Sequence, residues 1–151
     1  MKKKTKQKEK SRSEELSPRY FVDARLLEER GRSFTSLLAQ CACDEHSRAI
    51  SGSSSHGKGA KSPMAIIASC CSKKPGYLTA RTPTLEAVFK VLVANQNQPM
   101  SASELSQSIV IGGVGNNGLR DLSPELISRI VERDEFYGFT VKLPQLAKSG
   151  S

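Results

Sequence analysis

Four cysteines fall in two close pairs, Cys41 with Cys43 and Cys70 with Cys71. Structural zinc is held by thiolates and imidazoles, often in two pairs joined by a long loop. The spacing departs from the usual C-x-x-C, since one residue separates the first pair and none separates the second. We predict a zinc site whose ligands are Cys41, Cys43, Cys70 and Cys71. In the alternative interpretation, these cysteines are small, buried apolar side chains.

The stretch between the two cysteine pairs bears on the same prediction. Residues 51–62 are rich in serine and glycine, which indicates a flexible linker that a metal ion would close into a loop. His46 and His56 lie in or near this stretch and are reserve ligands. Disulfides are not expected, because the chain has the features of a cytoplasmic protein, whose thiols stay reduced.

Most of the net charge of +8 lies at the N-terminus. Residues 1–12 hold seven Lys or Arg and one Glu, whereas residues 81–151 hold seven basic and seven acidic groups. A basic tail can neutralise nucleic-acid phosphates without reading sequence, or it can simply keep a chain soluble. The predicted nucleic-acid contacts are Lys2, Lys3, Lys4, Lys6, Lys8 and Lys10 in the tail, with Arg120, Arg129, Arg133 and Lys142 in the folded part.

Other chemistry is not evident in the sequence. The run Gly112-Gly113-Val114-Gly115 is not a dinucleotide fingerprint, and the chain has neither a Walker loop nor a G-x-S-x-G elbow. We therefore expect a protein that is not an enzyme and has no small-molecule substrate. The N-terminus lacks the apolar core of a secretory signal, and no apolar run is long enough to span a membrane. A cytoplasmic protein without a membrane partner is the expectation.

The elements that would position these residues are mostly short helices. Hydrophobic residues make up only 37% of the chain, so we expect residues 1–17 and 144–151 to be disordered tails. Residues 18–50 should hold an extended piece and two short helices, with Asp23 and Ser33 as N-caps and a bend at Gly31. Residues 63–81 should hold a short helix capped by Ser62, followed by a connection.

Residues 82–143 carry the clearest periodicity. Thr82 is the predicted N-cap of a first helix, and Ser101 with Glu104 forms a capping box for a second. Ser123 caps a third helix, and a β-prone run with Gly138 follows it. The predicted core residues recur at helical spacing and are Leu85, Val88, Phe89, Leu92, Leu105, Ile109, Leu126, Ile127, Ile130 and Val131.

Three helices followed by a β segment resemble a winged helix-turn-helix. The resemblance implies a mainly α fold with a short β wing, in which 82–89 begins the first helix, 99–105 the second, 123–133 is the recognition helix and 136–143 part of the wing. The chain departs from that family in its long loop between Gly112 and Asp121, and in a recognition helix whose net charge is zero.

A looser resemblance covers about 120 residues. The segments 18–23, 31–34, 70–75 and 121–125 are similar to a family of small, uncharacterised bacterial proteins, and that similarity implies no activity. Two functions therefore stay open. The first is a non-enzymatic DNA-binding or transcription-related protein, and the second is a protein–protein interaction adaptor with a structural zinc site and no sequence readout.

Overall fold

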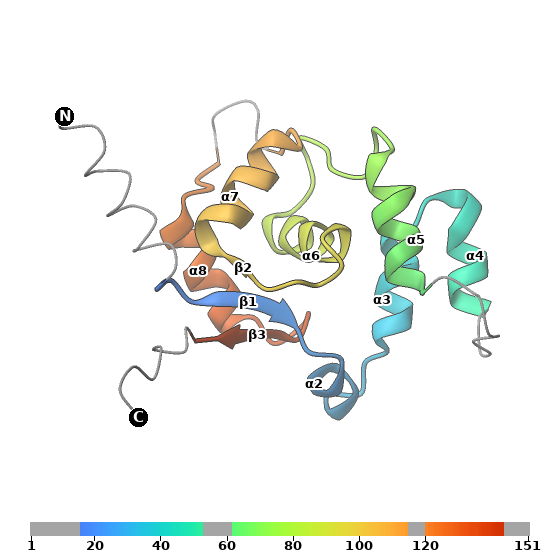
Figure 1. The fold of residues 1–151 in the computed structure, drawn as a ribbon, viewed down its shortest axis with the longest axis horizontal. Coiled ribbons are helices and arrows are strands. Elements are labelled where there is room, and N and C mark those ends of the chain that lie inside the picture. The colour runs from blue at the N-terminus through green and yellow to red at the C-terminus, as the bar shows by residue number, and fades with distance from the viewer. Residues whose placement is uncertain (1–15, 53–61, 115–119, 144–151) are drawn as a thin grey trace, which may run out of the picture.

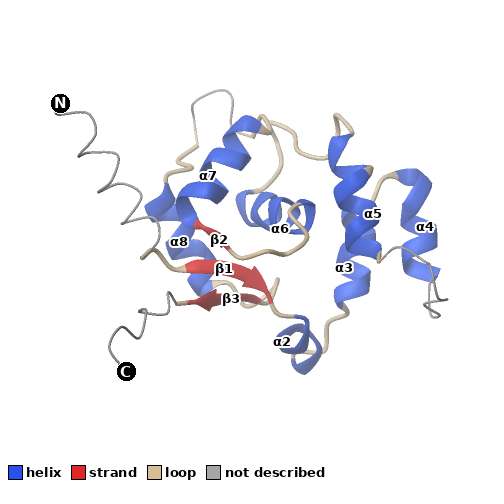
Figure 2. Ribbon diagram, viewed as in Figure 1, coloured by secondary structure: helices blue, strands red, loops and turns tan. Residues whose placement is uncertain are grey.

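The computed structural model describes residues 16–52, 62–114 and 120–143. Within them the chain is mainly helical, with one small antiparallel sheet (Figures 1 and 2). The helices are α2 (Ala24–Glu29), α3 (Phe34–Cys41), α4 (Asp44–Gly52), α5 (Pro63–Ser69), the 3-10 turn η1 (Cys71–Lys73), α6 (Thr84–Ala94), α7 (Ala102–Ile111) and α8 (Pro124–Arg133). The strands are β1 (Arg19–Val22), β2 (Met100–Ser101) and β3 (Phe139–Lys142).

The sheet joins the two ends of the described chain. Its order is β2-β1-β3, and both pairings are antiparallel, with Tyr20 opposite Met100 on one side and Val141 on the other. The central strand therefore comes from the N-terminal segment. The sheet therefore crosses the boundary predicted at residue 82, because β1 lies before that residue and pairs with β2 and β3, which lie after it.

Helix α6 lies at the centre of the molecule, between α7, α8 and the sheet on one side and α3 and α5 on the other (Figure 1). It is buried on most of its circumference, including Ala87, Phe89 and Leu92. The ring of Phe89 meets Phe34 edge-on at 6.4 Å and Tyr137 at 5.1 Å. These contacts make α6 the helix on which both sides of the fold pack.

Most of the predicted caps are present. The side chains of Asp23, Ser33, Ser62 and Ser123 each accept a hydrogen bond from a backbone N–H in the first turn of the helix they precede. Ser101 and Glu104 form the full capping box. These bonds satisfy amide groups that a helix N-terminus leaves without partners.

The predicted cap at Thr82 is wrong. Helix α6 begins at Thr84 after Pro83, and its N-cap makes no side-chain hydrogen bond. The Thr82 hydroxyl accepts from the Thr79 backbone N–H at 2.9 Å instead, so it closes the preceding turn. Among the ten predicted core residues, Leu85, Leu126 and Ile130 are only partly buried and the others are buried.

Helix α4 was not predicted from the sequence, since residues 18–50 were expected to hold two short helices, which are α2 and α3. Asp44 and Glu45 lie in its first turn, where carboxylates stabilise a helix N-terminus. Ile50 is 1% exposed and anchors the other end. The predicted linker is thus shorter at its start, because residues 51 and 52 belong to α4.

Some predictions fall on residues 1–15, 53–61, 115–119 or 144–151, which lie outside the described chain. They include most of the basic tail with its six lysines, the centre of the linker with His56, and the C-terminal tail. No helix within the described ranges is long and apolar enough to cross a bilayer.

Candidate functional site

Three of the four cysteines and one histidine meet where α4 begins and α5 ends. Cys43 lies between α3 and α4, and its carbonyl accepts from the backbone N–H groups of His46 and Ser47. This first turn of α4 turns the His46 ring back toward Cys43. Cys70 and Cys71 come from the junction of α5 and η1, on the other side of the linker.

The donor atoms of this cluster are close together. His46 Nδ1 lies 3.2 Å from Cys43 Sγ and 3.8 Å from Cys71 Sγ, and the two sulfurs are 3.2 Å apart. The ligand atoms of Cys43, Glu45, His46 and Cys70 all lie within 4.8 Å of one another. Thiols and an imidazole at these separations are compatible with a metal site.

The hydrogen bonds within the cluster change the acidity of its thiols. The contact with His46, and then the contact with Cys71, lowers the pKa of Cys43 to about 7. Burial raises the pKa of Cys71. Cys43 is therefore the thiol of the pair that more readily becomes a thiolate, the form that binds metals.

Cys41 is not brought to this cluster, although the sequence placed it among the ligands. It is the last residue of α3 and lies on the buried face of that helix, one turn after Leu37. Burial raises its pKa to about 12. His46, which the sequence offered only as a reserve ligand, lies in the cluster.

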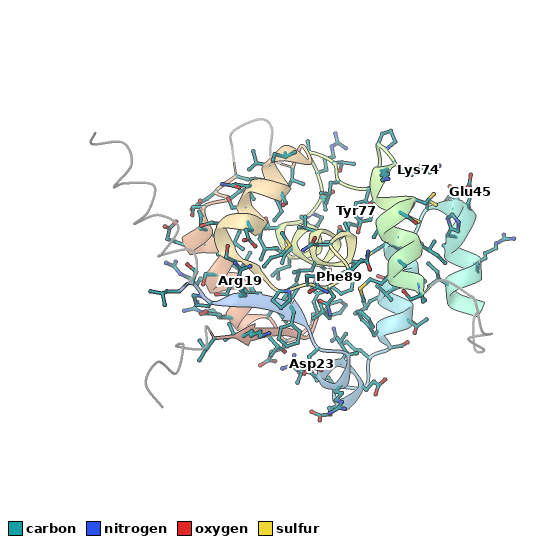
Figure 3. The ribbon with its side chains drawn as sticks, viewed as in Figure 1. Arg19, Asp23, Glu45, Lys74, Tyr77 and Phe89 are labelled. Carbon is teal, nitrogen blue, oxygen red and sulfur yellow. The ribbon has the colours of Figure 1, made fainter. Side chains whose placement is uncertain are left out.

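Tyr77 fixes the chain that follows the second cysteine pair. Its hydroxyl donates to the Lys90 carbonyl at 2.6 Å, and Lys90 Nζ donates to the Tyr77 carbonyl at 3.0 Å. An open hollow of 530 Å³ lies beside it, lined by Cys43, Glu45, Cys71 and Lys74 among others. Figure 3 shows Glu45 and Lys74 at the same end of the molecule, with Tyr77 directed toward α6. The cluster is therefore reachable from solvent.

A second candidate site is an open hollow of 680 Å³ between the α2–α3 turn and the end of α8. We call it the arginine hollow, and its lining residues are Arg30, Arg32, Leu85, Ile130, Arg133, Asp134, Glu135 and Phe136. The Arg32 guanidinium stacks 3.7 Å from the centre of the Phe136 ring and donates to the Phe136 carbonyl at 3.2 Å. The Asp134 carboxylate accepts from the backbone N–H groups of Phe136 and Tyr137.

The predicted nucleic-acid contacts are divided by the fold. Arg129 and Arg133 are exposed on α8, one turn apart. Arg120 is engaged elsewhere, donating to the Thr82 carbonyl and to Thr84 Oγ1, each at 2.7 Å. Lys142 is exposed on the edge strand β3, opposite Arg19.

Arg30 and Arg32 were missed by the sequence reasoning. The available signal was their position on either side of Gly31, the predicted end of the helix, whose φ is 76°. Phe136 was assigned to a β segment and not to a surface site. The contact between Phe136 and Arg32 joins residues 104 positions apart, so no local sequence pattern predicts it.

In comparisons with known proteins, no family model, curated protein or solved structure matches the chain.

Proposed function

We propose that this chain is a non-enzymatic nucleic-acid-associated protein that contacts phosphates and bases through the arginine hollow and the exposed face of α8. The observation that carries the proposal is that Arg30, Arg32, Arg133 and Phe136 line one open hollow, in which the Arg32 guanidinium stacks on the Phe136 ring. Guanidinium groups form bidentate hydrogen bonds with phosphates, and aromatic rings stack on the bases of single-stranded nucleic acid. The lining of the hollow holds three arginines and two carboxylates, Asp134 and Glu135, and the Asp134 carboxylate accepts from backbone amides.

The element order supports a winged-helix-like arrangement within this proposal. Helices α6, α7 and α8 follow one another, with β2 before α7 and β3 after α8, and α8 stands in the place of a recognition helix. The arrangement departs from the family resemblance in its central strand, since β1 precedes the three helices in the sequence. Arg129 and Arg133 would face the nucleic acid, and the basic residues before β1 would add non-specific affinity.

The proposal includes a zinc ion at the cysteine and histidine cluster. Soft thiolates with an imidazole select zinc over magnesium or calcium, which prefer oxygen ligands. A structural ion there would support the fold and take no part in a reaction.

The test is binding to duplex and single-stranded oligonucleotides over a range of salt, with the chain intact and without residues 1–15. Arg32→Ala with Arg133→Ala should weaken binding and reduce the slope of log affinity against log salt by about two, since each lost phosphate contact removes about one unit. The matched control is Lys73→Ala with Arg81→Ala, which removes two exposed charges from other elements.

Equal losses in both double variants would contradict the use of the arginine hollow. Complete loss of binding after deletion of residues 1–15 would show that the tail alone binds. Either result would favour the adaptor function. One observation favours the adaptor function. Val110 and Ile111, at the end of α7, are 49% and 85% exposed, so their apolar side chains are accessible to a protein partner.

A further inference from the structure

We propose that Cys43, His46, Cys70 and Cys71 are the four ligands of a structural metal ion that fastens the start of α4 to the end of α5. The inference rests on the metal cluster named in the proposed function and is independent of nucleic-acid binding. It assigns a ligand set that the sequence pairs alone did not give, with His46 in place of Cys41.

The separations fit a closed site. Zinc lies about 2.3 Å from each thiolate sulfur, so tetrahedral angles place ligand atoms about 3.5 to 3.8 Å apart. Cys43 Sγ, Cys71 Sγ and His46 Nδ1 are separated by 3.2, 3.2 and 3.8 Å. Cys70 Sγ lies within 4.8 Å of Cys43 Sγ and of a ring nitrogen of His46. The donor atoms of Cys43, Cys71 and His46 therefore lie within about 0.6 Å of tetrahedral separations.

The backbone at Cys70 allows two consecutive cysteines to face one ion. Within a continuous helix, neighbouring side chains point about 100° apart around the axis. Cys70 has φ −127° and ψ −65°, which are not helical values, and it separates α5 from the 3-10 turn η1. This break in the helix brings both sulfurs to the side that faces His46.

Cys71 is a better fourth ligand than Glu45. Its sulfur directly contacts both Cys43 and His46, and its side chain is 1% exposed. Glu45 is exposed, where water solvates its carboxylate. Structural zinc sites are built from cysteine and histidine alone, and three cysteines with one histidine form one of the common sets.

Charged groups of both signs lie beside such a site. Binding releases the three thiol protons and leaves the imidazole neutral, so a divalent ion with three thiolates carries one net negative charge. The adjacent hollow is lined by Lys74 and Lys90 and also by Asp44 and Glu45. The two ammonium groups do not compete for the metal, since a lysine side chain offers donors only.

The position of the ligands explains what the ion would do. Helix α4 lies at one edge of the molecule, beside α3 and α5 (Figure 1), and Ile50 is the single side chain fully buried among those described for its residues 44–50. A metal joining residues 43 and 46 to residues 70 and 71 closes the loop that contains α4 and the linker. Closing a loop of this length lowers the conformational entropy of the unfolded chain and so stabilises the folded, metal-bound protein.

The test uses the full chain, purified without chelator and titrated with Zn²⁺ and with Co²⁺, whose thiolate charge-transfer absorption increases with the number of sulfur ligands. We expect one equivalent of metal and the absorption of three thiolates. Cys43→Ser, Cys70→Ser and Cys71→Ser should each lower that absorption by about a third, in line with a set of three sulfurs. His46→Gln should weaken binding at least tenfold and leave the sulfur absorption of the loaded protein in place.

The controls are a cysteine and a histidine outside the set, and the glutamate that lies beside it. Cys41→Ala, His56→Gln and Glu45→Gln should bind Zn²⁺ and Co²⁺ as the unchanged chain does. Circular dichroism of each metal-free variant separates loss of a ligand from loss of the fold, because the metal-free parent supplies the reference spectrum.

Three results would overturn the assignment. The first is less than one tenth of an equivalent of bound metal, the second is an effect of Glu45→Gln larger than that of Cys71→Ser, and the third is loss of binding in His56→Gln. Binding of Co²⁺ by these four residues without detectable affinity for Zn²⁺ would retain the ligand set and reject zinc. Oligonucleotide binding, measured separately, decides the proposed function whatever the outcome for the metal.

Discussion

At the scale of single residues, Gly138 joins the N-terminal segment to the end of the chain. Its carbonyl accepts from the Asp23 backbone N–H at 2.9 Å, just after β1 ends, and its φ is 72°. A Cβ at this position would lie 2.8 Å from Leu27 Cγ and 3.1 Å from the Asp23 carbonyl oxygen. Glycine is therefore required here both by backbone conformation and by space.

Alanine substitutions at three glycines separate these two requirements. Gly76→Ala should leave the free energy of unfolding nearly unchanged, because φ is ordinary and nothing lies within 4 Å of the added Cβ. Gly31→Ala should cost about 1 kcal/mol, since its φ of 76° disfavours alanine while the space is open. Gly138→Ala should cost about 2 to 4 kcal/mol from conformation and crowding together. Urea unfolding measures all three, and equal losses at Gly31 and Gly138 would contradict the crowding.

Only part of the cysteine and histidine cluster could be predicted from the sequence. The sequence identified Cys43, Cys70 and Cys71 because close thiol pairs flank a long loop. It could not separate Cys41 from these, because the direction of a side chain depends on where α3 ends. Cys41 still belongs to the helix and joins its buried face, while Cys43 follows the extended residue Ala42. His46 enters the cluster because α4 begins at Asp44, and that start was not predicted.

At the scale of elements, local signals and tertiary contacts contributed differently. Capping residues before α3, α5, α7 and α8 are local, so the sequence predicted those starts correctly. Helix α4 depends on Ile50 packing beneath it and has no repeating apolar stripe, so periodicity missed it. The two-residue strand β2 has no pattern of its own and exists because β1 lies beside it.

The attachment of α4 gives a prediction about its local stability. Ile50→Ala removes the buried anchor of the helix and should cost about 2 to 4 kcal/mol for its attachment to the body. Hydrogen exchange should therefore quicken at the amides of α4 more than at those of α6. The increase should be smaller in protein loaded with Zn²⁺, because the ion would hold the other end of the helix.

Ile67→Ala is the comparison for that experiment. Ile67 is fully buried on α5, so its truncation should destabilise the whole fold and raise exchange in α6 as well. Faster exchange of α6 to the same degree in Ile50→Ala would contradict the view that α4 opens on its own.

At the scale of the whole molecule, the chain between residues 82 and 143 depends on the segment that precedes it. β1 fills the centre of the sheet, and Asn97 accepts from the Val22 backbone N–H and donates to its carbonyl, both at 2.8 Å. The Tyr20 hydroxyl lies 2.6 Å from Ser128 Oγ and donates to Glu132 on α8 at 3.0 Å. The sequence predicted the three helices of this region but not its central strand, because strand pairing across about 80 residues leaves no local pattern.

A fragment of residues 82–143 should therefore fail to fold cooperatively, whereas residues 16–143 should keep the stability of the full chain. Without β1, strands β2 and β3 lose their shared partner, and the surfaces that cover Tyr20, Val22 and Leu27 become exposed. Thermal unfolding followed by circular dichroism gives the measurement. Mixing the short fragment with residues 16–81 should restore a cooperative transition if the missing contacts are the cause. A sharp transition in residues 82–143 alone would contradict this dependence and establish the helical region as an independent domain.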